Sequence, residues 1–252
     1  MISLTFFGTS AAAVSVARGF TCIGIRDESD LLVLDCGDGS IKNLMRYGAD
    51  VREISNILVT HCHSDHISGL TQIVETMSMS KKQTELNVFG PAGLVEYFST
   101  VQRITNVAFH RQFQINLKEL TPNQHIKAGR KNILTFEMDH TLPCLGYRVE
   151  LEGRVVSFTG DTQPCASLND LGKDSNVFIH EATFLQKDLD KARQSRHSTP
   201  LNAAIAALSA KTSKLILTHV NDESEKPEEM IAEAGEKFDK VTVAYDGLTI
   251  DL

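Results

Sequence analysis

The sequence predicts an α/β fold in which two β-sheets pack face to face between two layers of helices, an αββα sandwich. Short apolar runs of the kind that form strands recur along the chain, and segments with helical periodicity separate many of them. Several runs end directly in a histidine or an aspartate, and open α/β sheets gather active sites at such strand ends. With 252 residues, 42% of them hydrophobic, the chain can build a sizeable core, so we expect one domain over residues 1–252.

The first part of the chain predicts three strands and a helix. Alternating or continuous apolar runs place the strands at residues 2–7, 22–26 and 31–34. The third strand ends at Asp35, and the glycine-rich segment after it permits a tight turn. A helix is expected over residues 40–47, with Gly48 as its stop.

The densest group of chemistry-bearing residues follows the apolar run at residues 56–60. Imidazole and carboxylate are the usual ligands of zinc and related divalent cations, and four such groups lie within six residues here: His61, His63, Asp65 and His66. In an extended segment residues i and i+2 point the same way, so His61 and His63 can reach one ion. Asp65 and His66 face elsewhere, near the start of an expected helix containing residues 68–77, and could hold a second ion. The motif suggests a metal pair; the alternative is a histidine-rich surface loop.

The rest of the chain continues with strands and helices. Glu152-Gly153 forms the expected turn of a hairpin. Ser198 or Thr199 caps a helix whose first turn contains Pro200. Strands are expected at residues 86–89, 113–117, 133–138, 146–151, 154–158, 176–179, 214–218 and 241–245, and helices at residues 92–104, 201–210 and 227–238.

Four of the expected strands end in a metal-type side chain. They deliver His61, His140, Asp161 and His219 from distant parts of the chain. A lone histidine such as His140 is more often structural, and its position after a strand is what makes it a ligand candidate. Random placement would seldom produce this series, so we expect the strand ends to form one metal site.

Composition and cysteine usage exclude several classes of protein. The formal net charge of −7 gives no overall attraction for nucleic acid. The chain has no apolar run of 18 residues and no basic segment at its start, so we expect neither a membrane span nor a secretory signal. Five scattered cysteines without a Cys-x-x-Cys pair are typical of reduced thiols in a cytoplasmic protein. Cys62 points away from the two histidines beside it and is expected to pack.

The motif His-x-His-x-Asp-His after a strand resembles the signature of the metallo-β-lactamase superfamily, most members of which are dinuclear metal hydrolases. The resemblance implies two divalent cations, in the first place Zn²⁺, and hydrolysis by a metal-bound hydroxide. It also implies that Asp35 braces a ligating histidine, the alternative being a turn-stabilising aspartate. The implied ligands are His61, His63 and His140 for one ion, Asp65, His66 and His219 for the other, and Asp161 as the bridge.

Within that superfamily the chain most resembles ribonuclease Z, the endonuclease that trims tRNA precursors at the 3′ end. The resemblance covers nearly the whole length and includes Phe7-Gly8-Thr9, Gly160-Asp161-Thr162, His180-Glu181-Ala182-Thr183-Phe184, His197-Ser198-Thr199 and Leu217-Thr218-His219. It implies an attack on phosphorus with Asp65, Glu181 and His197 as catalytic residues, RNA as partner and a homodimer. A histidine oriented by a glutamate can donate a proton to the departing 3′ oxygen. Alternatively, His197 is a helix-capping surface histidine and Glu181 an ordinary strand-end acid.

The chain departs from the ribonuclease Z pattern in two places. The family's long glycine- and proline-rich arm grips tRNA, but residues 141–160 leave room only for a hairpin. After His219 a segment with three acids replaces the family's Ser- and Arg-bearing segment, and acids repel a phosphate backbone. RNA would then be held by a second subunit or by scattered bases, which otherwise form a solvated surface: Lys81, Lys82, Arg103 and Arg111.

Three functions remain open from the sequence. The first is a ribonuclease Z-like phosphodiesterase that processes tRNA 3′ ends, and the His-Glu-Ala-Thr and His-Ser-Thr motifs favour it. The second is a dinuclear hydrolase of a small phosphodiester or another ester, which the missing arm and the net charge favour. The third is a non-catalytic metal-binding scaffold, and the complete ligand set argues against it.

Overall fold

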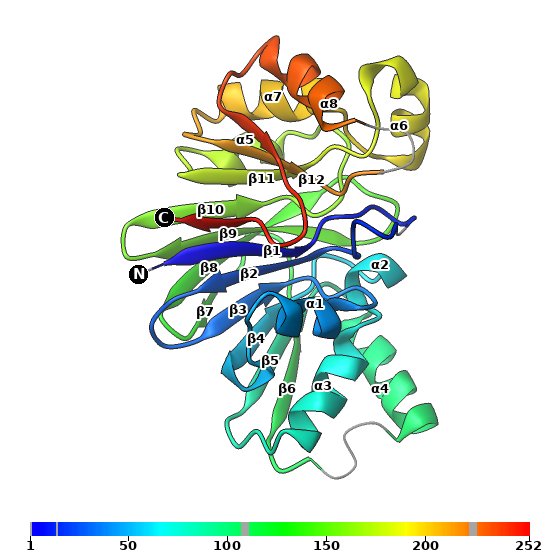
Figure 1. Ribbon diagram of the computed structural model, residues 1–252, viewed down its shortest axis with the longest axis vertical. Coiled ribbons are helices and arrows are strands. Elements are labelled where there is room, and N and C mark those ends of the chain that lie inside the picture. The colour runs from blue at the N-terminus through cyan, green and yellow to red at the C-terminus, as the bar shows by residue number, and fades with distance from the viewer. Residues whose placement is uncertain (1, 14, 107–110, 222–225) are drawn as a thin grey trace.

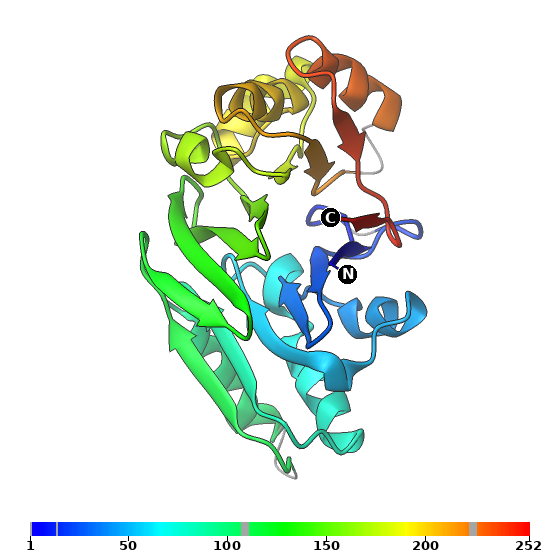
Figure 2. The same ribbon diagram turned by 90° about the vertical axis from the view of Figure 1, so that its left-hand side faces the viewer.

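Two β-sheets of seven strands each pack face to face in the computed structural model, which describes residues 2–13, 15–106, 111–221 and 226–252 (Figure 1). Helices cover the outer face of each sheet (Figure 1). The αββα sandwich predicted from the sequence is therefore confirmed. Figure 2 shows the two ends of the chain close together, where the last strand pairs with the first.

The first sheet has the strand order β14-β1-β2-β3-β4-β5-β6. Its strands are β1 (Ser3–Gly8), β2 (Cys22–Arg26), β3 (Leu31–Leu34), β4 (Ile54–Leu58), β5 (Leu86–Gly90), β6 (Ile115–Glu119) and β14 (Thr249–Asp251). β3, β4, β5 and β6 are parallel. Their C-terminal ends therefore lie at one edge of the sheet, where Asp35 follows β3 and His61 follows β4.

The second sheet has the order β13-β12-β11-β10-β9-β8-β7. Its strands are β7 (His125–Ala128), β8 (Lys131–Met138), β9 (Cys144–Leu151), β10 (Arg154–Phe158), β11 (Val177–Glu181), β12 (Leu215–Thr218) and β13 (Val241–Val243). β9 is antiparallel to both β8 and β10, and β10 to β13 are parallel. Consequently β8, β10, β11 and β12 all end at the same edge.

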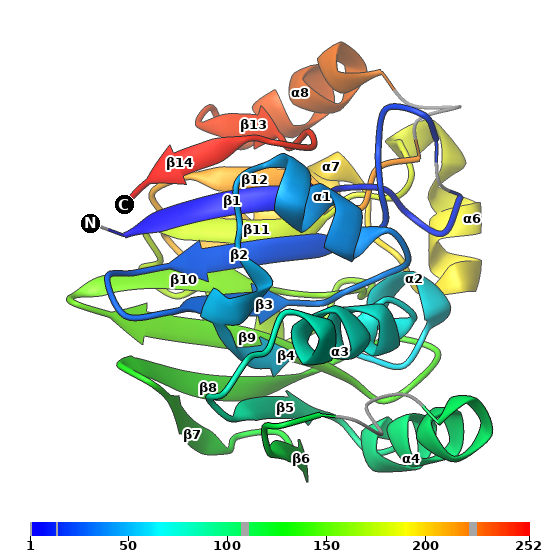
Figure 3. The same cartoon turned by 60° about the horizontal axis from the view of Figure 1, so that its bottom comes forward.

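Helices flank both sheets. They are α1 (Ser40–Arg46), α2 (Ser64–Ile67), α3 (Leu70–Met79), α4 (Leu94–Thr105), α5 (Ser167–Gly172), α6 (Leu189–Ser195), α7 (Pro200–Ser209) and α8 (Pro227–Gly235), with single turns at Val51–Glu53 and Gln186–Asp188. Figure 3 shows α2 and α6 at the same end of the sandwich. None of the helices in the described ranges is both long and apolar enough to cross a membrane.

The core has three layers, and β3 explains why its sequence is apolar without a break. Leu31 and Val33 pack between the first sheet and its helices, whereas Leu32 and Leu34 pack between the two sheets. A third cluster lies between the second sheet and its helices. Parallel strands buried on both faces read as continuous hydrophobic runs. The layer between the sheets holds the ligand-bearing strand ends of both sheets at a fixed separation.

The expected elements are present, with shifts of a few residues at several ends. The sequence did not predict β7, β14, α5 and α6. β7 and β14 have only four and three residues and are partly exposed, so neither carries a strong apolar alternation. The expected helix at residues 68–77 corresponds to α3, which begins two residues later, at Leu70. A short helix that was likewise not predicted, α2, precedes it across Ser68 and Gly69.

Gly69 lies between α2 and α3, where the chain packs closely against the turn after β3. A Cβ atom on Gly69 would lie 2.2 Å from the carbonyl oxygen of Gly37, and one on Gly37 would lie 2.2 Å from the carbonyl oxygen of Asp65. The two backbones therefore touch, and the amide of Gly69 donates to the carbonyl of Cys36 over 2.9 Å. This contact fixes the start of α2, and with it Asp65 and His66, against the turn after β3.

The β9–β10 hairpin turns at Glu152 and Gly153, as expected. Both residues have positive φ, 50° and 75°, as a two-residue hairpin of type I′ requires. Residues Leu151 and Arg154 are paired directly across it. The long arm expected in ribonuclease Z is therefore absent from this position.

A buried ion cluster joins the two sheets at the end opposite to the strand-end histidines. Lys131, at the start of β8, is fully buried. Its Nζ donates to Asp27 Oδ2 over 2.9 Å and also to Asp30, both on the turn between β2 and β3. No sequence pattern indicates this pairing, because the partners are about a hundred residues apart.

Candidate metal centre

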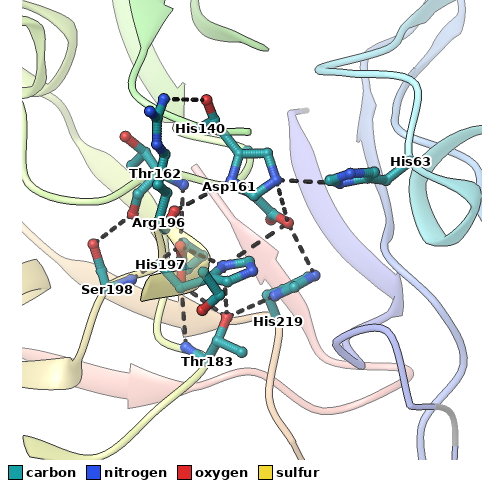
Figure 4. A network of polar contacts seen from close by, with 12 residues as sticks. His63, His140, Asp161, Thr162, Thr183, Arg196, His197, Ser198 and His219 are labelled. Carbon is teal, nitrogen blue, oxygen red and sulfur yellow. Dashed lines mark hydrogen bonds and ion pairs between the residues drawn. The ribbon is translucent and has the colours of Figure 1, made fainter. Parts of the chain in front are cut away.

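All seven residues singled out as metal ligands lie together at the strand ends. They form two groups that share Asp161, and within each group the ligand atoms lie within 4.8 Å of one another. The first group is His61, His63, His140 and Asp161, and the second is Asp65, His66, Asp161 and His219. Figure 4 shows the part of this centre around Asp161.

The first group brings three ring nitrogens together beside one carboxylate. His63 Nδ1 lies 2.9 Å from His61 Nε2 and 3.1 Å from His140 Nε2. Asp161 Oδ2 is 3.7 Å from His61 Nε2 and 3.9 Å from His140 Nε2. β4 delivers His61 and His63 from the first sheet, while β8 and β10 deliver the other two from the second.

The second group is built in the same way on the other side of Asp161. His66 Nε2 lies 3.3 Å from His219 Nε2, and Asp65 Oδ2 lies 3.5 Å from the former and 3.3 Å from the latter. Asp161 Oδ2 is 3.4 Å from each of these two nitrogens. One carboxylate oxygen thus faces four histidines of the two groups.

Hydrogen bonds from outside the centre orient four of its histidines. Four of them use Nδ1 for an outward hydrogen bond, which leaves the Nε2 atom facing the centre. Three of these bonds join His66 to Asp35 over 2.7 Å, His61 to Thr60 over 3.0 Å and His140 to the carbonyl of Arg196 over 3.2 Å. His219 bonds to Thr183 over 2.8 Å. Such outer bonds fix the tautomer and the ring orientation of a ligand.

Asp35 is the brace that the resemblance implied. Besides His66, its carboxylate accepts hydrogen bonds from the amide and the hydroxyl of Thr60, over 2.7 and 2.8 Å. Thr60 in turn bonds to His61, so one buried carboxylate orients a ligand of each group. Asp35 also has a φ of 57°, a left-handed conformation that holds its carboxylate toward the centre.

The hydrogen bonding of Asp161 shows whether the residues of the site fit a cation. Its Oδ1 atom is buried and has no hydrogen-bond partner among the described residues. A buried carboxylate oxygen without a donor is costly, and a cation would remove that cost. Together with the inward Nε2 atoms, this orphaned oxygen shows that the donor set fits divalent metal.

A family model described as a β-lactamase superfamily domain matches residues 32–220, a range that contains all seven ligand candidates and Asp35. The chain belongs to this superfamily.

Relatives within the β-lactamase superfamily match the whole chain. Ribonuclease Z of Myxococcus xanthus is 26% identical over 309 aligned positions, which cover 100% of this chain and 98% of that protein. Ribonuclease Z of Archaeoglobus fulgidus is 26% identical over 306 positions, with 100% and 98% covered. Both alignments are longer than the 252 residues of this chain, so these relatives carry residues that have no counterpart here. The resemblance to ribonuclease Z therefore extends over the full length.

Solved structures agree with this membership. The short form of human tRNase Z has a TM-score of 0.86 at 26% identity, and the match covers 99% of this chain and 98% of that one. YhfI of Bacillus subtilis, described as a metallo-β-lactamase fold protein, has a TM-score of 0.88 at 19% identity and 100% coverage of both chains. The second match shows the shared fold.

Glu181 and His197 stand together next to the superfamily centre. Glu181 Oε1 accepts from His197 Nδ1 over 2.9 Å, and His197 Nδ1 lies 4.0 Å from Asp161 Oδ2. Glu181 is fully buried and also accepts from the amides of Thr162, Thr183 and Ser198. The His197 side chain is 14% exposed. Thr199, not Ser198, caps α7, so His197 is held by Glu181 and lies outside the cap.

The protonation states of the first ligand group suit a cationic centre. Burial, with the nearby His66, holds the pKa of His61 well below its ordinary value, and burial also lowers the pKa values of His63 and His140. Burial alone would raise the pKa of Asp161, but His219 and His66 outweigh it and lower that pKa strongly. Three neutral imidazoles and an ionised carboxylate are the ligand forms.

The pKa of His197 shifts in the opposite direction. Burial alone would lower its pKa, but the carboxylate of Glu181 outweighs burial and raises the pKa of His197 to about 9. Burial likewise opposes the ionised form of Glu181, and His197 lowers the Glu181 pKa in return. Glu181 therefore favours the protonated form of His197 at the rim of the centre.

Sequence reasoning missed three residues that orient the ligands: Thr60, Thr183 and Arg196. Thr183 stands inside the His-Glu-Ala-Thr motif, and its place two residues after Glu181 was the available signal. Arg196 acts on His140 through a main-chain carbonyl, which no side-chain pattern can reveal.

Two further expectations concern residues outside the centre. Cys62 belongs to neither ligand group and packs against the core between the first sheet and its helices. Lys82, considered above as a surface base for RNA, is only 2% exposed, and its Nζ donates to the Arg52 carbonyl and the Thr84 hydroxyl. It is therefore a structural lysine and not part of an RNA surface.

Proposed function

We propose that this chain is a ribonuclease Z-like phosphodiesterase that holds two divalent cations, in the first place Zn²⁺. The observation that carries the proposal is the pair of ligand groups that share Asp161 beside the Glu181–His197 pair. A donor set of five histidines and two aspartates is rich in nitrogen, which suits zinc better than magnesium or calcium. When bound, two such ions supply neutralisation of substrate charge and make water acidic enough to attack near neutral pH.

The chain's own residues position the ligand groups and supply the proton. Asp65, on the second ligand group, faces His219 and positions that side of the centre. Glu181 holds His197 by its Nδ1 atom, so Nε2 is the nitrogen free to face the substrate. His197 then donates a proton to the departing oxygen, and Glu181 stabilises the charged ring before the transfer.

Precursor tRNA is the substrate class that the relatives favour, since they carry the name ribonuclease Z at 26% identity over full length. We propose tRNA 3′-end processing in the cytoplasm by a homodimer. Five free cysteines support a reducing compartment. A second subunit would have to supply the grip on tRNA that the absent arm does not provide.

A small phosphodiester is the second candidate, and a specific observation favours it. The β9–β10 connection is a two-residue turn, and Lys82, one of the bases considered for RNA binding, is buried. Neither of them can then hold the phosphates of a long RNA. A small ester needs the metal centre and the Glu181–His197 pair alone. A non-catalytic scaffold would have no use for a stored proton beside the ligands, which argues against that third reading.

One experiment separates these functions. Metal-loaded protein is incubated with a precursor tRNA carrying a 3′ trailer and, separately, with bis(p-nitrophenyl) phosphate. We expect cleavage at the 3′ end of the tRNA together with release of p-nitrophenol, and loss of both after chelation. Hydrolysis of the small diester alone would move the assignment to the second candidate, and no hydrolysis of either would refute the phosphodiesterase.

A further inference from the structure

Several strand-end segments around the metal centre carry no cation. Residues 59–66 after β4, 139–143 after β8, 159–166 after β10 and 219–221 after β12 contain neither lysine nor arginine. RNA carries a negative charge at every phosphate, so a strand that crosses this edge needs cations from another segment. The connection that follows β11 supplies four of them: Lys187, Lys191, Arg193 and Arg196.

Two of these four cations face acids, which leaves the arginines for phosphate. Lys191 Nζ lies 2.6 Å from Asp188, and Lys187 Nζ lies 3.5 Å from Glu229. Arg193 is exposed in the last turn of α6 and pairs with no acid in the part of the chain that the structure describes. Its guanidinium can therefore bind a phosphate without first breaking an ion pair.

Arg196 is only partly engaged. Its Nη1 atom donates to the His140 carbonyl over 3.0 Å and lies 3.3 Å from Asp139, but the side chain is 51% exposed. Arg196 and His140 both line a cavity of about 850 Å³ beside the metal centre. A strand bound on this side of the centre therefore passes Arg196. Arginine suits such a strand because its planar fork can donate two hydrogen bonds to one phosphate.

The end of α6 fixes both arginines relative to His197, the proposed proton donor. The amide of His197 donates to the Ala192 carbonyl over 2.8 Å, and the amide of Arg196 donates to the Arg193 carbonyl over 3.2 Å. With Arg196 at a φ of 56°, these two bonds form a Schellman motif. Glycine is the usual residue at that left-handed position, and an arginine is less favourable there. Such a departure indicates a use for the arginine side chain.

We propose that Arg193 and Arg196 bind the phosphates of RNA on the 5′ side of the cleaved bond. The proposal rests on the phosphodiesterase function and adds to it the residues that hold the strand. His197 donates to the departing 3′ oxygen, so the nucleotide that carries this oxygen lies next to Arg196, and its 5′ phosphate reaches the arginines. The contact is local to the cleaved bond and is separate from the grip on tRNA that the absent arm would provide.

Binding without turnover gives the first test. The probe is a fluorescent precursor tRNA in which a methylene group replaces the departing 3′ oxygen, so that it cannot be cleaved there. Arg193 is the residue to change, because Arg196 also holds the His140 carbonyl. With metal-loaded protein, fluorescence anisotropy should show binding about three- to tenfold weaker for Arg193→Gln. The slope of log K against log salt concentration should also become smaller, by about 0.7.

Arg154→Gln is the matched control for this measurement. Arg154 is exposed at the start of β10, at the opposite end of the sheet from the ligands, and its substitution removes the same charge. We expect this variant to bind the probe as wild type does. Equal binding by wild type and both variants would overturn the proposal. Equal weakening by both variants would overturn it too, because the attraction would then be general.

Uncharged linkages locate the contact on the RNA. Two further probes carry methylphosphonates, one at the two linkages before the cleaved bond and the other at the two linkages after it. The difference in affinity between wild type and Arg193→Gln should vanish with the first probe and persist with the second. A difference that survives neutral linkages on the 5′ side would overturn the assignment.

The same proteins separate failure of this proposal from failure of the phosphodiesterase function. If Arg193→Gln weakens binding of the probe but wild type does not cleave the natural precursor, the RNA surface stands and the phosphodiesterase function fails. If wild type cleaves the precursor and Arg193→Gln binds the probe equally well, the function stands and the proposed surface is overturned.

Discussion

At the scale of single residues, the centre depends on the groups that hold the histidines in place. Asp35 and Thr60 orient His66 and His61. The ligand candidates could be named from the sequence, because the His-x-His-x-Asp-His motif and the strand-end positions single them out and the resemblance to the superfamily implies the full set. Thr60 and Arg196 do not, because a hydroxyl or a main-chain carbonyl becomes an orienting group only when folding brings it to the right nitrogen.

Asp35→Asn should weaken metal binding. The variant keeps the shape of a fully buried side chain but removes the carboxylate that His66 Nδ1 bonds to. We expect zinc affinity to fall by about 10–100-fold, measured by competition with a chromogenic chelator. Asp38→Asn, exposed in the following turn, should leave the affinity unchanged. An Asp35 variant with wild-type affinity would contradict the bracing role.

His197→Ala should act on the departing oxygen. A phenolate such as p-nitrophenolate leaves without a proton, whereas an alkoxide needs one. We expect the rate with an alkyl leaving group to fall by about 10²–10⁴-fold, and the rate with p-nitrophenol to fall much less. The measurement is kcat for a matched pair of diesters. Equal slowing of both would remove the proposed acid role from His197.

At the scale of elements, burial determined which strands could be predicted from the sequence. β3 and β12 are buried on both faces and appear as continuous apolar runs, so they could be predicted. β7 and β14 lie at sheet edges and carry mixed residues, so only pairing with a neighbour makes them strands. The ion pairs between β8 and the β2–β3 turn likewise depend on contacts far apart in sequence.

Lys131→Met should destabilise the protein. It leaves Asp27 and Asp30 without their shared cation at a buried site. Removing one partner of a buried ion pair costs about 3–5 kcal/mol, and we expect a loss of that order in the free energy of unfolding measured with urea. Lys127→Met, exposed on β7, is the matched control. A Lys131 variant as stable as the control would show that the cluster adds no stability.

The same cluster predicts how stability depends on pH. Burial alone would raise the pKa of Asp27, but hydrogen bonds from Ser29 and Lys131 outweigh it and hold that pKa well below the ordinary 3.8. A lowered carboxyl pKa gives stability that is present above 3.8 and is lost as the pH falls below it. Asp27→Asn should therefore lose less stability than wild type between about pH 4 and pH 2. Parallel curves in urea titrations would contradict this.

At the scale of the whole molecule, the metal centre joins the two sheets. The first sheet contributes His61 and His63 and the second contributes His140 and Asp161 to one ligand group. We propose that residues 1–252 fold as one domain, supported by the shared core layer between the sheets. The sequence could predict this architecture because ligand-type residues follow strands of both sheets. These residues can form one site only if the two sheets pack against each other.

Removal of the metal should therefore lower the melting temperature. A ligand that binds only the folded state stabilises it, by about 4 kcal/mol at a thousand times its Kd. We expect calorimetry to show a lower Tm after chelation and recovery when Zn²⁺ is restored. Asp161→Ala, which removes the shared carboxylate, should respond much less to chelation. A wild-type Tm that does not change on chelation would argue against ions between the sheets.

The two-residue turn at Glu152 and Gly153 has a consequence for how such proteins diversify. The eight residues of β9 run from the ligand edge to this turn, so the turn lies about 25 Å from the two ligand groups. Chain can be added or removed there without displacing any metal ligand. Substrate specificity and catalytic chemistry can consequently change independently. Inserting a peptide between these two residues is a direct way to change which substrate the enzyme binds.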